Sequence, residues 1–410
     1  IAALFNTKVR TGVKGRKTLE NHIKIIKDKL NEKYDSSKLI LFHCVSMGEY
    51  EQARPLVKII KREFPEYAMG ISFFSPTGME FYKPIKEIDF VCYSPVDKYK
   101  KCMNYFEILK PDVLVIVKHD IWPNMIKAAS DLKIKLIMID AALPQHSKRL
   151  SFIVKKFYAY IYSLFDYIFP ISENDEERIK DIGSDIKKSI VAGDTRFDQV
   201  VERGLKAREN RGKKIFTDNF NDILILGSVW RSDTDNIFQG FLKILADFPH
   251  AGAIIVPHEP EESYLASIEE ELKKNGLHFD RYTHLDKDKK TKKRIILVDT
   301  VGVLAELYIY ADIAFVGGSF VPGVHNVMEP GIMGIPVLFG PKHENSFEAI
   351  QLAELGGGFV VENNDEFYDK TSMILNNSNI LEKMGGIAEE YVSRNIGAAE
   401  RIYENIKGIL

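Results

Sequence analysis

Short apolar runs recur along this chain, and each is followed by a small or polar residue and then by an amphipathic stretch of helical length. This order is typical of βαβ units, in which parallel strands alternate with crossover helices. The expected strands are 39–45, 69–74, 89–93, 113–118, 135–139, 167–171 and 189–192 in the first half, and 223–227, 253–257, 294–298, 312–316 and 335–339 in the second. The pattern therefore predicts an α/β protein built on parallel sheets.

The chain is long enough for two such sheets. Its 410 residues exceed what one ordinary core holds, so two domains are expected. Residues 203–221 are polar and rich in lysine, arginine and glycine, which predicts a linker. We expect an N-terminal domain over 1–202, a C-terminal α/β domain over 222–386, and a long amphipathic helix over 387–410 that packs back across the first domain.

Composition excludes several classes of protein. The formal net charge is −2 and 28% of residues are charged, which is typical of a globular protein and gives no sign of a nucleic-acid partner. The three cysteines, Cys44, Cys92 and Cys102, show no CxxC or Cys/His spacing. Neither a disulfide framework nor a zinc site is therefore expected.

The first residues combine an apolar fragment, 1–5, with a basic stretch. Its positively charged residues are Lys8, Arg10, Lys14, Arg16 and Lys17. Such a stretch is typical of the flank of an N-terminal apolar anchor, where basic residues face anionic lipid headgroups. An ordinary solvated terminus fits these residues equally well.

Ligands of an open parallel sheet bind beyond the carboxyl ends of its strands, and a glycine-rich loop follows one of these strands. Residues 317–329 (GGSFVPGVHNVME) run from that loop into a helix that is expected to start near Asn326. Loop amides with a helix N-terminus behind them favour phosphate, and Glu329, one turn after Asn326, can accept from ribose hydroxyls. For Gly317 and Gly318 alone, a simple tight turn is the commoner explanation.

The corresponding segment of the first half is 46–49 (SMGE), directly after the first strand. Gly48 allows close approach of a ligand, and Glu49 would project from the first helical turn, where the helix N-terminus keeps it ionised. The same spacing fits a capping box, with Ser46 as the N-cap and Glu49 three residues later. Spacing alone favours the cap, and both roles can coexist.

Seven segments together resemble the Kdo (3-deoxy-D-manno-octulosonic acid) transferases, enzymes of lipid A assembly with the GT-B architecture. They are HCVSMGEYEQARPL (43–56), SFFSPTGMEFY (72–82), VKHDIWPN (117–124), VAGDTRFD (191–198), VPHEPE (256–261), DTVGVLAELYIYADIAFVGGSF (299–320) and HNVMEPGIMGIPVLFGP (325–341). They follow the family's order and cover nearly the whole chain. The resemblance implies two facing Rossmann-like parallel-sheet domains with a C-terminal helix that crosses back.

The resemblance also implies roles for individual residues. Glu49 matches the glutamate of the S-x-G-E motif, the general base that takes the proton from the acceptor glucosamine 6'-hydroxyl. Asn326, Val327, Met328 and Glu329 match the N-x-x-E motif at the CMP ribose and phosphate. The remaining matches are Gly302, Val303 and Leu304 for backbone contacts to CMP, Pro257 and His258 for the P-R pair, Arg196 for the basic residue of K-F-D, and Ser319 for the loop beside the donor phosphate.

Two motifs depart from the common family pattern. Many members read E-T-E-L-W-P-N where this chain has KHDIWPN over 118–124, so Asp120 stands in for a catalytic acidic residue. The P-R-H motif becomes Pro257, His258 and Glu259, which removes an arginine. A Bacteroidetes-like branch of the family has V-K-x-E-x-W and P-H-E at these places, so the resemblance is to that branch.

The mechanism implied is an inverting, metal-independent transfer from CMP-Kdo to a lipid A precursor, with no cofactor, at the cytoplasmic face of the bacterial inner membrane. The protein would sit there peripherally or through a single N-terminal anchor. The expected holders of the donor and acceptor charges are Lys118, Arg196, Arg231, His258 and His325. The alternatives are another GT-B enzyme, such as a UDP-sugar transferase or a sugar-nucleotide epimerase, and a catalytically silent membrane-associated scaffold.

Overall fold

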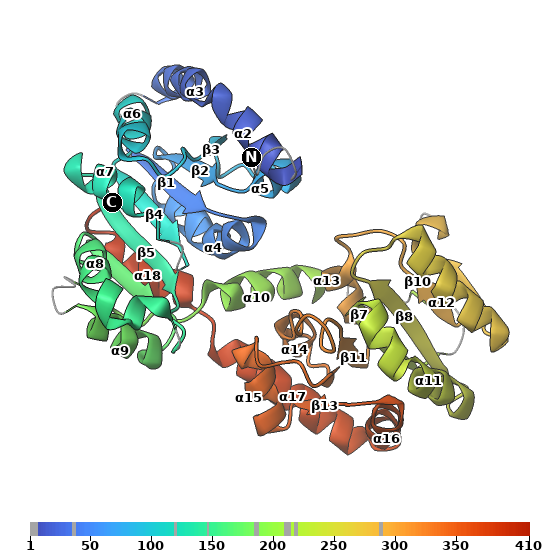
Figure 1. Cartoon of the computed structure of the whole chain (residues 1–410). Coiled ribbons are helices and arrows are strands. Elements are labelled where there is room, and N and C mark those ends of the chain that lie inside the picture. Colours follow the sequence, from blue (N-terminus) through green and yellow to red (C-terminus); the bar gives the residue numbers. More distant parts are fainter. Residues whose placement is uncertain are drawn as a thin grey trace. The chain divides into compact units, whose positions relative to one another are not determined.

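A computed structural model of the protein describes residues 7–34, 38–118, 121–145, 147–183, 188–208, 215–216, 220–286 and 290–410, apart from the side chains of 7–9, 152 and 205–208. The chain divides into two compact units (Figure 1). Unit 1 comprises Ile1–Gln199 and Asn395–Leu410, and unit 2 comprises Val200–Arg394. Each unit is built on one parallel sheet, so the prediction of an α/β protein with two parallel sheets is confirmed.

The sheet of unit 1 has the strand order β3-β2-β1-β4-β5-β6, with every pair parallel. Its strands are β1 (Leu39–Cys44), β2 (Ala68–Phe73), β3 (Phe90–Tyr93), β4 (Val113–Val117), β5 (Lys135–Ala141) and β6 (Tyr167–Pro170). The central strands are continuous apolar runs because helices cover both faces of the sheet. The expected strand 189–192 is wrong: Ser189 forms only an isolated bridge with Ile168.

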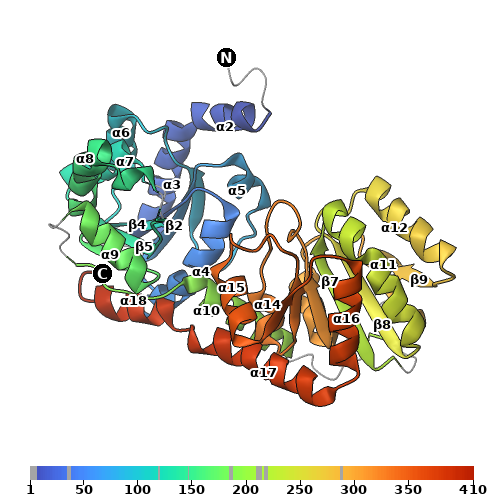
Figure 2. The same ribbon diagram turned by 60° about the horizontal axis from the view of Figure 1, so that its bottom comes forward.

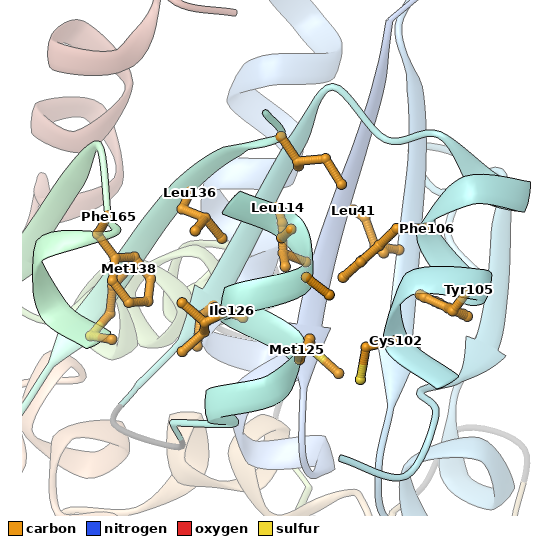
Figure 3. Close-up of a cluster of buried hydrophobic side chains, with 14 of the residues drawn as sticks. Leu41, Cys102, Tyr105, Phe106, Leu114, Met125, Ile126, Leu136, Met138 and Phe165 are labelled. Atoms are coloured by element: carbon orange, nitrogen blue, oxygen red, sulfur yellow. The ribbon is translucent and has the colours of Figure 1, made fainter. Parts of the chain in front are cut away.

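Two apolar clusters, one on each face, hold this sheet to its helices. Figure 3 shows the first cluster, in which Leu41, Leu114 and Leu136 of the strands meet Phe106 and Ile126 of the helices. The second cluster joins the other face to α4 and α18. The helices of unit 1 are α2 (Thr7–Lys17), α3 (Leu19–Lys33), α4 (Met47–Glu63), α5 (Pro76–Phe81), α6 (Tyr99–Leu109), α7 (Pro123–Asp131), η1 (Lys148–Leu150), α8 (Phe152–Ser163), α9 (Glu173–Ile182) and α18 (Ala398–Ile406).

The C-terminal segment differs from the single helix expected over 387–410. Two helices occur instead, α17 (Ser378–Arg394) in unit 2 and α18 in unit 1. The break falls at Gly397, whose φ of 91° is left-handed and suits glycine. The Asp198 carboxylate accepts from the amides of Gly397 and Ala399, the latter at 2.8 Å, and so caps α18. The chain therefore does return to the first sheet, but through a new helix.

The sheet of unit 2 has the order β13-β12-β11-β7-β8-β10-β9, again parallel throughout. Its strands are β7 (Asp222–Val229), β8 (Ala251–Pro257), β9 (Phe279–Arg281), β10 (Ile295–Leu297), β11 (Ile313–Val316), β12 (Val337–Phe339) and β13 (Gly358–Val360). The edge strands β9 and β13 were not predicted; they are only partly buried, unlike the equally short β10 and β12.

The helices of unit 2 cover both faces of this sheet. They are α11 (Arg231–Asp247), α12 (Glu262–Lys274), η2 (Tyr282–His284), α13 (Leu304–Leu307), η3 (Tyr308–Tyr310), α14 (Met328–Ile332), α15 (Phe347–Leu355), α16 (Asn364–Leu375) and α17. Of these, α11 and α16 pack side by side (Figure 2). The predicted linker 203–221 is wrong in its first part, because α10 (Thr195–Arg208) continues as a helix through it.

Within the described residues, no helix is both long enough and apolar enough to cross a membrane.

Candidate active site

Glu49 lies where the sequence placed it, in the first turn of α4 just beyond the end of β1. Its Oε2 accepts from the amide of Ser46 at 3.1 Å and also from the amide of Val45. The predicted capping box is therefore present, and the side chain is only 7% exposed. Neighbouring Gly48 is exposed, and a Cβ built there would meet only Ser46 Oγ, at 3.8 Å. The space at Gly48, the residue before Glu49, is thus open for a ligand to approach.

Arg196 is brought close to the helix that carries Glu49. Its guanidinium forms an ion pair with Asp194, with Nη2 to Oδ2 at 2.6 Å, and its side chain remains 42% exposed. The preceding residue, Thr195, donates its hydroxyl to the Gln52 carbonyl at 2.7 Å, one turn after Glu49 on α4. This contact fixes the start of α10 against α4.

A buried carboxyl group supports the same contact. Asp140, the second-last residue of β5, has a φ of 52°, and it accepts from the Thr195 amide at 2.9 Å and contacts the Thr195 hydroxyl at 2.5 Å. Burial, together with the nearby Asp194 carboxylate, raises the pKa of Asp140. A protonated Asp140 can donate to Thr195 Oγ1 while that hydroxyl donates to Gln52, so all three groups are satisfied. These contacts through Thr195 fix the backbone at Arg196 and leave the Arg196 side chain out of the network.

The predicted KHDIWPN segment is only partly described. Asp120 lies outside the described residues, and Lys118 has a left-handed backbone with a φ of 69°. Trp122 packs on Phe74 with ring centroids 4.3 Å apart. The Arg16 guanidinium lies 4.4 Å from the same Phe74 ring.

Arg16 therefore does not share the role expected for the basic N-terminal stretch. Its Nε donates to the Ser94 carbonyl at 2.8 Å and its Nη2 to the Phe74 carbonyl at 2.5 Å. A Cβ on Gly15 would overlap the Tyr93 ring, at 2.2 Å, so glycine is needed for this contact. Arg16 docks α2 onto the carboxyl ends of β2 and β3.

In unit 2, a buried carboxylate that sequence reasoning missed organises the glycine-rich loop. Asp233, in the first turn of α11, accepts from the amides of Gly318 at 2.7 Å, Phe320 at 3.2 Å and Trp230 at 2.8 Å. Its burial raises the pKa of this carboxyl group. The amides of Gly318 and Phe320 are therefore turned to Asp233, and the expectation that they form a phosphate cradle is wrong for this conformation.

Ser319 lies in the same loop and is fully buried, with Oγ donating to the Val316 carbonyl at 3.0 Å. A contact between this hydroxyl and a phosphate would first require that bond to break. Together with the bonds to Asp233, this hydrogen bond holds the loop in place.

The N-x-x-E segment has the predicted form. The Asn326 side chain accepts from the Met328 amide at 3.0 Å, and α14 begins at Met328. The side chains of Val327 and Met328 are buried, so only their backbone can meet a ligand. Glu329 is partly exposed and lies 3.7 Å from the Arg203 guanidinium of α10.

The remaining predicted contacts lie at other strand ends of the same unit. Gly302 has a φ of 85° and open space where a Cβ would stand, so its backbone conformation is what requires glycine. Val303 and Leu304 follow it at the start of α13. Pro257 ends β8, and the His258 amide donates to the Val229 carbonyl at 2.9 Å.

Three aromatic rings stack at the carboxyl ends of β7 and β8. His258 lies 4.5 Å from Trp230 and 4.4 Å from His325, and its Nδ1 is 2.7 Å from Ser228 Oγ. The Trp230 indole donates to His325 Nε2 at 2.9 Å. Sequence reasoning singled out both histidines but missed Trp230. A tryptophan two residues after the Gly227-Ser228 pair at the end of an apolar run was the available signal.

Two of the five residues expected to hold the donor and acceptor charges do not present a cation to the site. Burial, followed by the neighbouring His258, lowers the pKa of His325 to about 4, so this imidazole is neutral at pH 7. Arg231 is turned to α12, with its guanidinium 4.9 Å from the Tyr264 ring and 3.4 Å from Ser267 Oγ. Of the two histidines in the stack, His258 is thus the one that can become positively charged.

Comparison with known proteins adds an independent line of evidence. Residues 17–199 match the family model described as 3-deoxy-D-manno-octulosonic-acid transferase (kdotransferase). The chain is similar to the 3-deoxy-D-manno-octulosonic acid transferases of Haemophilus influenzae (26% identical over 90% of this chain and 87% of the relative) and Aquifex aeolicus (28% over 81% and 85%). The chain is thus similar to Kdo transferases over most of its length.

A bifunctional glycosyltransferase/methyltransferase of Fusobacterium nucleatum is 32% identical over 90% of this chain. The chain spans 58% of that relative's length. Among solved structures, it is similar to UDP-GlcNAc 2-epimerase from Neisseria meningitidis, with a TM-score of 0.63, 16% identity and coverage of 91% of this chain and 100% of that one. It is also similar to a putative UDP-N-acetylglucosamine 2-epimerase from Listeria monocytogenes, with a TM-score of 0.60, 18% identity and coverage of 91% of this chain and 96% of that one. At this identity the likeness shows the fold alone, and it supports the predicted GT-B class.

Proposed function

We propose that this protein is a Kdo transferase, which moves Kdo from CMP-Kdo onto a lipid A precursor. The observation that carries the proposal is the Glu49 carboxylate next to exposed Gly48 at the start of α4, inside the region that matches the family model. A carboxylate held by backbone amides stays ionised and is ready to accept a proton. Gly48 leaves room for an acceptor alcohol next to it.

The proposed reaction is a direct displacement with inversion. The acceptor hydroxyl loses its proton to Glu49 while its oxygen bonds to the anomeric carbon of Kdo. The bond from that carbon to the phosphate oxygen breaks, and the electron pair leaves with CMP. Arg196 and His258 are proposed to stabilise the negative charge on the leaving group, so the reaction is expected to proceed in the presence of a metal chelator.

Glu329→Gln tests the nucleotide half of this proposal. The variant keeps the shape of the side chain but loses the charge that accepts from ribose hydroxyls, which is worth about 1.5–3 kcal/mol. We expect CMP to bind about 10–100-fold more weakly, as measured by calorimetry. Glu354→Gln, an exposed change on α15, is the matched control and should bind CMP like the parent.

The same assay separates the alternative functions. Competition between CMP and UDP for the parent protein should favour CMP, and a preference for UDP would indicate a UDP-sugar enzyme instead. Incubation with CMP-Kdo and a tetraacyl lipid A precursor should add the mass of one or more Kdo units. A parent protein that binds CMP but adds no sugar would favour the scaffold.

We also propose that unit 1 contacts an anionic membrane surface through α2 and α3, as expected for a peripheral protein at the cytoplasmic face. Lys14, Lys17 and Lys24 are exposed on these helices. Two apolar side chains accompany them, Val13 at 48% and Ile25 at 53% exposure. Lysines that reach anionic headgroups beside apolar side chains are typical of a peripheral membrane contact.

The double substitution Lys14→Gln/Lys17→Gln tests this contact. Each lysine near an anionic surface contributes about 1 kcal/mol, so partitioning onto vesicles that contain phosphatidylglycerol should fall roughly 30-fold in a sedimentation assay. Lys292→Gln/Lys293→Gln removes two exposed charges from unit 2 and should leave partitioning unchanged. Equal loss in both variants would contradict a contact through α2.

A further inference from the structure

The three-ring stack of Trp230, His258 and His325 sets the charge that unit 2 offers to an anion. His258 directly follows β8, at the sheet edge where ligands of parallel sheets bind. Its ring is half-buried, with Trp230 at 4.5 Å and His325 at 4.4 Å. The 5° angle between the two imidazole planes makes this a face-to-face contact.

The hydrogen bond from Trp230 decides the protonation of His325. An indole N–H only donates, so His325 Nε2 must be the unprotonated nitrogen that accepts it at 2.9 Å. The ring proton of His325 is then on Nδ1, and the ring is neutral. Protonating Nε2 would set two donors against each other, so Trp230 holds His325 uncharged.

A neutral His325 leaves His258 free to become the one cation of the stack. Two stacked imidazolium rings would repel, whereas one cation between a neutral imidazole and an indole gains from the indole face. The groups that face His258 agree with this. Ser228 Oγ lies 2.7 Å from Nδ1 and can accept from it, and the carboxylates of Glu259 and Asp233 favour the protonated ring.

In the unliganded protein, however, burial outweighs those carboxylates and lowers the pKa of His258. The ring is therefore mostly neutral at pH 7, and the stack offers little positive charge to solvent. A phosphate that reaches the β8 end would reverse the balance, because an anion next to the ring stabilises its charged form.

Building on the proposed function, we propose that His258 takes up a proton when the nucleotide phosphate binds, so that the cation that holds the donor forms on binding. The sign follows from linkage. If the pKa of His258 is higher in the complex than in the free protein, affinity is greatest at low pH and falls as pH rises between the two values.

Calorimetry with CMP tests this directly. At pH 7.5, where the CMP phosphate is already dianionic, titrations in Hepes and Tris buffers report the protons taken up, because these buffers differ in ionisation enthalpy. The parent should take up a measurable fraction of one proton per CMP. His258→Arg, which is cationic at all these pH values, should bind CMP without proton uptake. His250→Gln removes an exposed histidine of the same unit and should behave like the parent.

Affinity over pH 7.0–8.5 gives a second readout. Relative to His258→Arg, the parent's affinity for CMP should fall by up to roughly tenfold per pH unit. The Arg variant also corrects for titration of CMP itself. Nitrogen-15 spectra of the complex should show both ring nitrogens of His258 protonated and His325 Nε2 unprotonated. Equal uptake in parent and His258→Arg, or a proton found on His325 Nε2, would overturn the inference.

The two proposals fail in different ways. If CMP binds without proton uptake, the His258 inference fails and the CMP-dependent function stands. If CMP does not bind but UDP does, the proposed donor is wrong, and the same calorimetry with UDP still decides whether His258 takes up a proton.

Discussion

Glu49→Gln is expected to lower the rate of sugar transfer by about 10²–10⁴-fold, because it removes the group proposed to accept the acceptor proton. Glutamine still accepts from the amides of Val45 and Ser46, since either residue serves at this position of a capping box. The start of α4 should therefore remain folded, and CMP affinity should match the parent. Transfer is measured by the mass of the sugar-extended lipid, and affinity by calorimetry.

Two control variants separate catalysis from capping. Ser46→Ala removes the N-cap side chain and should cost about 1 kcal/mol of stability while keeping the carboxylate. Glu51→Gln changes a carboxylate two residues away on α4 that pairs with Arg54 at 2.8 Å. Both variants should retain most of the transfer rate. If Ser46→Ala loses as much activity as Glu49→Gln, Glu49 acts by holding the helix and not as the base.

Asp233→Ala is expected to have the largest effect on stability. The change leaves the amides of Trp230, Gly318 and Phe320 without their acceptor, and each buried unsatisfied amide costs about 1–3 kcal/mol. A loss on the order of 3 kcal/mol or more in the free energy of unfolding is expected from denaturant titration. CMP affinity should fall as well, because the loop from Gly318 to Phe320 loses its anchor.

Asp235→Ala is the matched control, because it removes an exposed carboxylate from the same helix and should change stability by less than about 0.5 kcal/mol. Asp233→Asn, which keeps one acceptor oxygen, should fall between the two. A stability change as small for Asp233→Ala as for Asp235→Ala would show that the loop amides find other acceptors.

Much of the fold follows from local sequence. The long apolar runs at 39–45 and 113–118 became β1 and β4, because a strand buried on both faces needs continuous apolar residues. The errors fall where local signals are weak. The short edge strand β13, which is only partly buried, was missed. The continuation of α10 through the polar stretch from 203 was also missed, because the packing partner of that stretch lies far away in sequence.

The candidate site shows the same division. The capping box at Glu49 and the turn from Asn326 to Glu329 were predictable, since they depend on residues two to four positions apart. The capture of the loop amides by Asp233 was not, because its partners lie more than 80 residues away.

The sequence by itself determined the alternation of strands and helices, the residues that follow each strand, and the resemblance to the Kdo transferases. Only the tertiary structure decided which polar groups of those segments meet a ligand and which meet each other. Arg16 lies over the Phe74 ring, and the hydrogen bond from Trp230 keeps His325 uncharged, although sequence spacing predicted neither contact. The physical reason is that local spacing fixes where a side chain starts along the chain. Its charge and hydrogen bonds depend on neighbours that only the folded sheet brings within reach.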